Sequence, residues 1–179
     1  LSQSKINLIK EFNLISLKPV IYVANVDENQ KDGPALDAVK KKAQSDNSEM
    51  IIMCNQLEAE ISELGDDKEE FLKEVGLIEP GLNRLIKVAY HTLGLRTYFT
   101  AGEKEVRSWV IKDGFTAPQA AGVIHTDFEK GFIRAETVSF DHYIQFNGEQ
   151  GSKASGKWRS EGAEYIVNDG DVILFRFNV

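Results

Sequence analysis

Two apolar runs in the first half of the chain predict strands. Val20–Ala24 and Met50–Cys54 are apolar at every position, which is typical of strands buried on both faces of a parallel sheet. Residues 34–46 between them place apolar side chains on one helical face among Lys and Asp, which predicts an amphipathic helix. Strand, helix and strand together predict a βαβ unit with parallel strands.

Helical spacing dominates the rest of the first half. Short helices are expected over 57–64 and 67–75, and Pro80 opens a longer helix that Gly94 stops. Residues 1–14 carry apolar side chains at near-helical spacing without a preceding cap, so they are expected to be the end of a helix.

After Gly94 the pattern changes from helical spacing to alternation. Apolar and polar residues alternate around 106–110, and strands are also predicted over 132–140 and 172–179. Thr116 and Pro118 predict the start of a short helix over 119–124. We therefore expect a small α+β sheet with a helix on one side, and a domain boundary near residue 94.

Composition fits an ordinary globular chain. The 179 residues are 42% hydrophobic and 27% charged, with a single cysteine. The single cysteine and the lack of a signal peptide or an apolar run of membrane-spanning length predict a cytoplasmic protein without membrane attachment. The net charge of −7 argues against broad adhesion to bare nucleic acid, although a local basic face stays open.

The polar loop Asn25-Val26-Asp27-Glu28 follows the first predicted strand directly. Ligands of parallel sheets bind beyond the carboxyl ends of strands, where guanine readers carry Asn-Lys-x-Asp. Val26 and Glu28 replace the Lys and the final Asp, which disfavours guanine without establishing adenine. The loop can also be an ordinary polar turn, and residues 29–32 offer a competing Asn-x-x-Asp register.

The second strand ends in Cys54, Asn55 and Gln56 at the start of a helix. This loop is expected at the same sheet edge, where backbone N–H groups could meet a base or ribose. Cys54 is more typical of a small buried residue than of a nucleophile. The chain contains no Gly-x-x-x-x-Gly-Lys-[Ser/Thr] and no Asp-x-x-Gly motif, so we expect no catalytic residues here and no hydrolysis by this chain alone.

Several ordered blocks resemble the C-terminal half of the YchF family of Obg-like P-loop ATPases, from Lys18 to Val179. They are Asn25-Val26-Asp27-Glu28, Leu57-Glu58 with Glu60, Glu79-Pro80-Gly81-Leu82-Asn83, Tyr98-Phe99-Thr100-Ala101-Gly102, Glu105-Val106-Arg107-Ser108-Trp109, residues 125–133 (HTDFEKGFI), and Tyr165-Ile166-Val167 with Asp169-Gly170-Asp171 before Phe175-Arg176-Phe177-Asn178.

The resemblance implies a fold and a division of the chain. Residues 1–17 would end a helical insertion, and 18–93 would be the C-terminal part of a P-loop nucleotide-binding domain with a parallel sheet. Residues 94–179 would form a TGS domain, an α+β fold of the β-grasp, ubiquitin-like kind.

The resemblance also implies a function. The chain would be part of a ribosome-associated protein that binds and hydrolyses ATP, with the P-loop Lys and the Mg²⁺ ligands outside these residues. Asn25, Val26 and Glu28 would lie at the adenine, and Cys54, Asn55 and Gln56 would match the last G-protein motif. Relatives often carry small residues where Asn55 and Gln56 stand, which argues against side-chain contacts with the base.

A second group of candidates lies in the expected TGS domain. His125 can titrate near neutral pH and donate to phosphate or ribose, or it can simply hydrogen-bond the adjacent loop. Lys153, Lys157 and Arg159 flank Trp158, and this arrangement could contact RNA or the ribosome, unless the tryptophan belongs to the core.

Two other functions stay open at this point. Residues 94–179 could be a non-enzymatic module that binds RNA or the ribosome, with 1–93 as structural support. A TGS regulator like the stringent-response synthetases is a third reading, which the predicted βαβ unit at 18–54 argues against.

Overall fold

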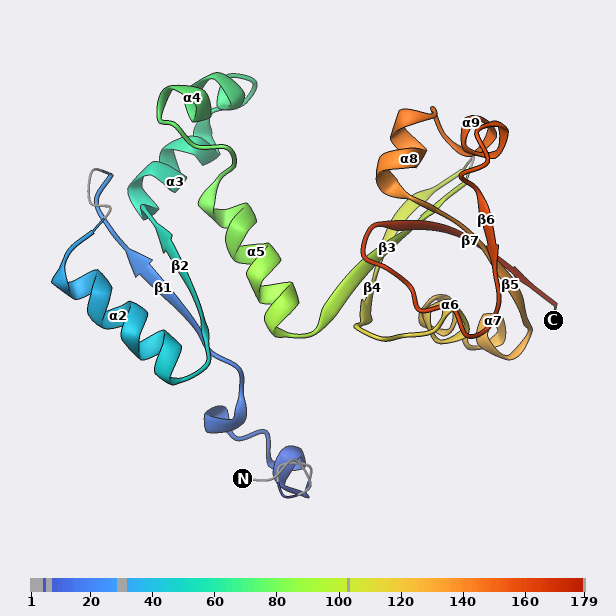
Figure 1. Ribbon diagram of the computed structural model, residues 1–179, viewed down its shortest axis with the longest axis horizontal. Coiled ribbons are helices and arrows are strands. Elements are labelled where there is room, and N and C mark those ends of the chain that lie inside the picture. Colours follow the sequence, from blue (N-terminus) through green and yellow to red (C-terminus); the bar gives the residue numbers. More distant parts are fainter. Residues whose placement is uncertain (1–4, 6–7, 29–31, 103, 179) are drawn as a thin grey trace. The chain divides into compact units, whose positions relative to one another are not determined.

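The structure is a computed structural model that describes residues 5, 8–28, 32–102 and 104–178. The chain divides into two compact units, Leu1–Leu93 and Gly94–Val179, and each has its own sheet (Figure 1). The first sheet has two strands and the second has five. None of the helices in the described part of the chain is long and apolar enough to span a membrane.

A βαβ unit forms the centre of the first unit, as predicted. β1 (Ile21–Asn25) and β2 (Glu49–Met53) pair in parallel, so that the first residues of the strands lie opposite each other, as do the last. α2 (Pro34–Ser45) connects them and buries Leu36 and Ala43. The helix begins after Gly33, whose φ of 132° is one that glycine adopts without strain.

The remaining helices of this unit are α3 (Asn55–Glu63), α4 (Lys68–Glu74) and α5 (Gly81–Thr92), close to their predicted positions. Of the helix expected over 1–14, residues 1–4, 6 and 7 lie outside the described residues; residues 8–9 are helical and residues 13–14 are not. Two short 3-10 helices, Lys10–Phe12 and Ile15–Leu17, precede β1.

The expectation that the first strand is buried on both faces is wrong for this chain. Val23 is 44% exposed and Val20, just before the strand, is 50% exposed. Among the strands that the structure describes, β1 pairs with β2 alone, so the layers that normally cover a central parallel strand are not supplied by these residues.

The second unit contains a mixed sheet with the strand order β4-β3-β7-β5-β6. β3 and β4 form an antiparallel hairpin, β3 and β7 are parallel, and β5 pairs antiparallel with both β7 and β6. The strands are β3 (Leu95–Ala101), β4 (Val106–Lys112), β5 (Phe132–Ser139), β6 (Arg159–Glu161) and β7 (Asp171–Phe177).

One face of this sheet is covered by α6 (Ala117–Ile124), which buries three alanines against Tyr98, Ile173 and Phe175. The predicted cap at Thr116 is present, because the Thr116 N–H donates to Gln119 Oε1 at 2.9 Å.

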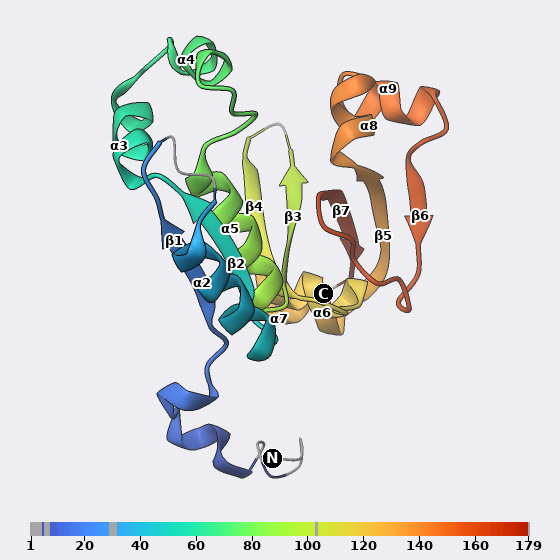
Figure 2. The same ribbon diagram turned by 60° about the vertical axis from the view of Figure 1, so that its left-hand side comes forward.

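Three shorter helices were not predicted: α7 (Thr126–Lys130), α8 (Phe140–Gln145) and α9 (Glu149–Ala154). In Figures 1 and 2, α6 and α7 lie at one end of β5, and α8 and α9 lie at the other.

Candidate functional site

The carboxyl ends of β1 and β2 meet at one edge of the first sheet. Asn25 lies opposite Met53, and the Val26 N–H donates to the Met53 carbonyl at 3.0 Å. The prediction that the two strands deliver their following loops to a common edge is therefore confirmed.

The Asn25 side chain joins these two loops. Its Oδ1 accepts a hydrogen bond from the Asn55 N–H at 3.0 Å. This bond uses a backbone donor that we expected to be free for a base or ribose. The carbonyl oxygen of the Asn25 amide thus has a structural partner, and its Nδ2 group remains the donor that can face a ligand.

The other predicted residues of this edge differ in exposure. Val26 and Cys54 are half-buried, whereas Glu28, Asn55 and Gln56 are exposed. Cys54 is a free thiol at the N-cap position of α3. The competing register at 29–32 falls mostly on residues 29–31, outside the described part of the chain.

Sequence reasoning missed the role of Glu58, which lies one turn into α3. Its Oε1 accepts from the Gly81 N–H at 2.6 Å and its Oε2 accepts from the Leu82 N–H at 3.1 Å. Glu58 therefore satisfies free donors at the start of α5, where a negative charge is also favourable. The signal was present in the sequence, since both partners lie in blocks shared with the YchF family.

The second unit does not gather its candidate residues into one site. His125 lies between α6 and α7, where its Nδ1 accepts from the Asp127 N–H at 3.2 Å and so caps α7. Lys153 and Lys157 lie in and just after α9, and Arg159 begins β6, where it pairs with Thr137 of β5. Of the two alternatives for His125, contact with phosphate or ribose and local hydrogen bonding, the structure contains the local hydrogen bond.

Two of the three basic candidates are paired with acids. The ammonium of Lys153 contacts Glu149 and lies 5.2 Å from the centre of the Trp158 ring. The guanidinium of Arg159 lies 3.2 Å from Glu161. These pairs neutralise most of the local positive charge that the sequence suggested.

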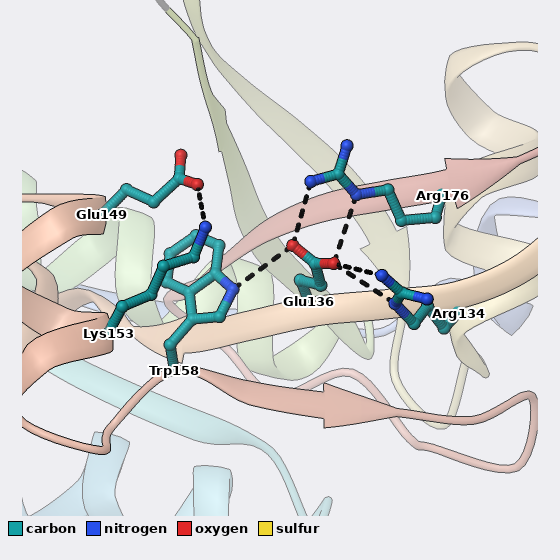
Figure 3. A network of polar contacts seen from close by, with 6 residues as sticks. All are labelled: Arg134, Glu136, Glu149, Lys153, Trp158 and Arg176. Atoms are coloured by element: carbon teal, nitrogen blue, oxygen red, sulfur yellow. Dashed lines mark hydrogen bonds and ion pairs between the residues drawn. The ribbon is translucent and has the colours of Figure 1, made fainter.

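Trp158 belongs to a polar network around the buried carboxylate of Glu136, drawn in Figure 3. Arg176 contacts both carboxylate oxygens at 3.2 Å, and Arg134 contacts Oε1 at 2.9 Å. The Trp158 Nε1–H donates to Oε2 at 3.4 Å. The hydrogen bonds from Arg176, and then those from Arg134 and Trp158, lower the pKa of Glu136 to about 2 against the opposing effect of burial.

Within the described ranges, no cluster of three or more His, Cys, Asp or Glu side chains could hold a metal ion.

Comparison with known proteins identifies relatives of the chain. The family model YchF-GTPase_C, described as "Protein of unknown function (DUF933)", matches residues 95–178. The Ribosome-binding ATPase YchF of Haemophilus ducreyi is 53% identical over all of this chain and 50% of its own length. The protein of the same name from Bacillus subtilis is 50% identical over 96% of this chain and 48% of its own.

Solved structures agree with these matches. The structure titled Schizosaccharomyces pombe YchF GTPase aligns with 98% of this chain and 48% of its own, with a TM-score of 0.80 and 34% identity. A GTP binding protein from Pyrococcus horikoshii aligns with 90% of this chain and 46% of its own at a TM-score of 0.61, and its 17% identity shows likeness of fold alone. The chain spans about half the length of the curated relatives it matches. Its sequence and fold match the C-terminal half of YchF-family proteins.

Proposed function

We propose that this chain supplies the base-reading edge of a ribosome-associated ATPase, in which Asn25, Val26 and Glu28 contact the adenine. The observation that supports this most directly is the bond from the Asn55 N–H to Asn25 Oδ1, which fixes the two loops as one edge. Cys54, Asn55 and Gln56 would form the neighbouring wall, through their backbone more than through their side chains.

The chemistry of this edge suits an aminopurine. With its oxygen occupied, the Asn25 amide can donate from Nδ2 to a ring nitrogen such as N7. The exposed Glu28 carboxylate is an acceptor for an exocyclic amino group, which adenine presents where guanine presents a carbonyl. Half-buried Val26 offers an apolar contact for the ring.

Hydrolysis would need groups that these residues do not provide. In the proposed intact protein, a P-loop Lys would bind the phosphates and Mg²⁺ would bridge them, with its ligands outside this chain. The part supplied here would select the base and take no part in the chemical step.

For residues 94–179 we propose a TGS domain of the β-grasp kind that carries partner binding at the ribosome in the cytoplasm. Support comes from the strand order β4-β3-β7-β5-β6, in which the first and last strands of the domain are parallel neighbours at the centre. The bacterial relatives are named ribosome-binding ATPases, which supports the ribosome as the partner.

Nucleotide titration tests the adenine assignment, which matters because the relatives are named ATPases and the solved structures carry GTP in their titles. In the full-length protein that contains this chain, we expect Glu28→Asp to reduce the ratio of ATP to GTP affinity by roughly tenfold, measured by calorimetry. Glu63→Gln, on the distal end of α3, is the control. If neither protein binds nucleotide, or if the ratio is unchanged in Glu28→Asp, Glu28 does not read the base.

A further inference from the structure

The sheet face that α6 does not cover is apolar at β3 and β4, whereas at β5 and β7 it carries the Arg134, Glu136 and Arg176 network. In β3, Tyr98 points to the covered face, where its hydroxyl donates to the Ala120 carbonyl at 2.9 Å. Phe99 therefore points to the other face, together with Val106 and Val110 of the paired strand β4. Val106 is 72% exposed and Val110 is 42% exposed.

α8 extends this face. The Phe140 ring lies 5.7 Å from the Phe99 ring, centre to centre, and Ile144 follows one helical turn later on the same side of α8. Phe140 is 47% exposed and Ile144 is 58% exposed. We call Phe99, Val106, Val110, Phe140 and Ile144 the outer patch. Contiguous apolar surface of this kind commonly marks an interaction site.

An acidic pocket opens beside the outer patch. It has a volume of about 250 Å³ and is lined by Phe99, Phe140, Asp141 and Asp169 with Ser139 and Gly170. Asp169 Oδ1 accepts from the Thr97 N–H at 2.7 Å, which holds its carboxylate in place. Asp141 is exposed at the start of α8.

The lining of this pocket fits a positively charged side chain. Two carboxylates and two aromatic rings line it, and no cationic side chain does. Carboxylates pair with a guanidinium or ammonium group, and aromatic faces attract the same cations. A nucleic acid phosphate would meet like charge here.

The other charges of this unit also favour a positively charged partner. Lys153 and Arg159, which the sequence suggested for RNA contact, are engaged by Glu149 and Glu161. Residues 94–179 carry 10 Lys and Arg against 12 Asp and Glu. The surface therefore complements a basic protein better than it complements RNA.

We propose that the outer patch and its acidic pocket bind a basic, apolar segment of a protein, with one Arg or Lys side chain between Asp141 and Asp169. This inference rests on the proposed function, since it makes a protein component of the ribosome, and not its RNA, the partner of residues 94–179.

Peptide titration of the whole 179-residue chain tests the pocket. The probe is acetyl-Leu-Arg-Leu-amide, followed through the backbone amide resonances of Phe99, Phe140 and Asp141. Its counterpart with citrulline in place of arginine keeps the shape and removes the charge. We expect the arginine peptide to shift these resonances and to bind about three- to fivefold more tightly than the citrulline peptide.

Three variants test which side chains bind the peptides. Asp141→Asn should abolish the preference for arginine over citrulline, and Phe140→Ala should weaken both peptides. Glu164→Gln removes an exposed carboxylate outside the pocket and should change neither. Equal binding of the two peptides, or no shift at these resonances, would overturn the inference. The inference would also be overturned if a 12-nucleotide RNA shifted the resonances of Phe99, Phe140 and Asp141 and the arginine peptide did not.

Co-sedimentation with purified ribosomes separates this inference from the proposed function. If the chain sediments with ribosomes and Asp141→Lys reduces the bound fraction severalfold, both are supported. If the variant sediments as well as the parent chain, the patch is not the ribosome contact although the proposed function stands. If the chain does not sediment but binds the arginine peptide, the proposed ribosome contact fails and the cation pocket stands.

Discussion

The environment of Glu136 is unlike that of a surface acid. It is 8% exposed, yet its carboxylate receives hydrogen bonds from two guanidinium groups and an indole N–H (Figure 3). A buried charge is tolerated only when it is paired and hydrogen-bonded, as it is here. The network links β5 to β7 and to the loop that carries Trp158.

Removing this charge should destabilise the second unit. We expect Glu136→Gln to lower the free energy of unfolding by roughly 1–3 kcal/mol, because two arginines lose the negative charge and one acceptor oxygen that they share. Chemical denaturation followed by tryptophan fluorescence measures the change. Glu149→Gln breaks only the exposed pair with Lys153 and should cost at most about 0.5 kcal/mol. Equal effects of the two substitutions would contradict the structural role of Glu136.

The same residue predicts a dependence of stability on pH. The pKa of Glu136 is about 2 in the fold, against an ordinary value of 4.5. A lowered pKa means that the unfolded chain takes up the proton first, so this contribution is complete above about pH 4.5 and disappears as the pH falls toward 2. Stability curves between these limits should fall less steeply in Glu136→Gln than in the parent chain. Parallel curves would show that Glu136 does not titrate as described.

At the scale of elements, α5 is fixed by the neighbouring helix. Glu58 of α3 accepts from the first two N–H groups of α5, and Arg84 donates to the Ile52 carbonyl of β2 at 3.1 Å. Both contacts hold α5 against elements that form the candidate base-reading edge.

Loss of the contact between Glu58 and α5 should destabilise the first unit. Glu58→Ala leaves two donors at the α5 N-terminus without acceptors, and we expect it to cost about 1–2 kcal/mol of unfolding free energy. Amide exchange of residues 81–84 should accelerate. The matched control is Glu60→Ala on the same helix, whose side chain is exposed and accepts a hydrogen bond from Gln56 at 3.4 Å. Unchanged exchange in Glu58→Ala would rule out the capping role.

The junction of α7 and β5 depends on Gly131. A Cβ at this position would collide with the backbone carbonyl of Asn178, which belongs to the same close crossing where the Asn178 N–H donates to the Gly131 carbonyl at 2.8 Å. Gly131→Ala should therefore destabilise the second unit by at least about 2 kcal/mol. Gly162→Ala, where a Cβ meets open space, should stay within about 0.5 kcal/mol of the parent. Thermal unfolding of both variants decides this.

The sequence predicted the elements that are long enough to show a period. α2 and α5 each span 12 residues and carried a clear helical stripe, and the parallel pair β1 and β2 followed from two apolar runs. α7, α8, α9 and β6 have five, six, six and three residues, too few for a period to stand out. Such short elements depend on tertiary contacts such as the burial of Ser152 in α9.

The location of the candidate site could be predicted from the sequence, but its hydrogen bonds could not. The positions of Asn25 and Cys54 at the ends of two apolar runs predicted both loops at one sheet edge. The hydrogen bond from the Asn55 N–H to Asn25 Oδ1 could not be predicted from the sequence, and neither could the capping of α5 by Glu58. Each of these bonds joins residues more than 20 positions apart in the chain.

At the scale of the whole molecule, the two units differ in how completely they bury their apolar side chains. The core of the second unit, centred on Tyr98, Ile173 and Phe175, draws only on residues after Gly94. The first unit leaves Val23, Leu82 and Ile86 at 44%, 54% and 48% exposed. A sheet of two strands rarely folds well without further layers.

Separate expression should reveal this difference. We expect residues 94–179 to fold alone with an amide spectrum that overlays the corresponding signals of the whole chain. Residues 1–93 alone should unfold at lower denaturant concentration or bind a hydrophobic dye. An unfolded 94–179 segment would mean that the second unit depends on the first.

The bond between Asn25 and the second loop has a consequence for the substitutions that each position tolerates. The donor at position 55 is a main-chain group, so any amino acid except proline can provide it, while position 25 must keep an acceptor of the right length. A comprehensive scan of both sites should return a permissive profile at 55 and a restrictive one at 25. Substitutions other than proline at position 55 should therefore keep the two loops joined, whereas loss of the acceptor at position 25 should separate them.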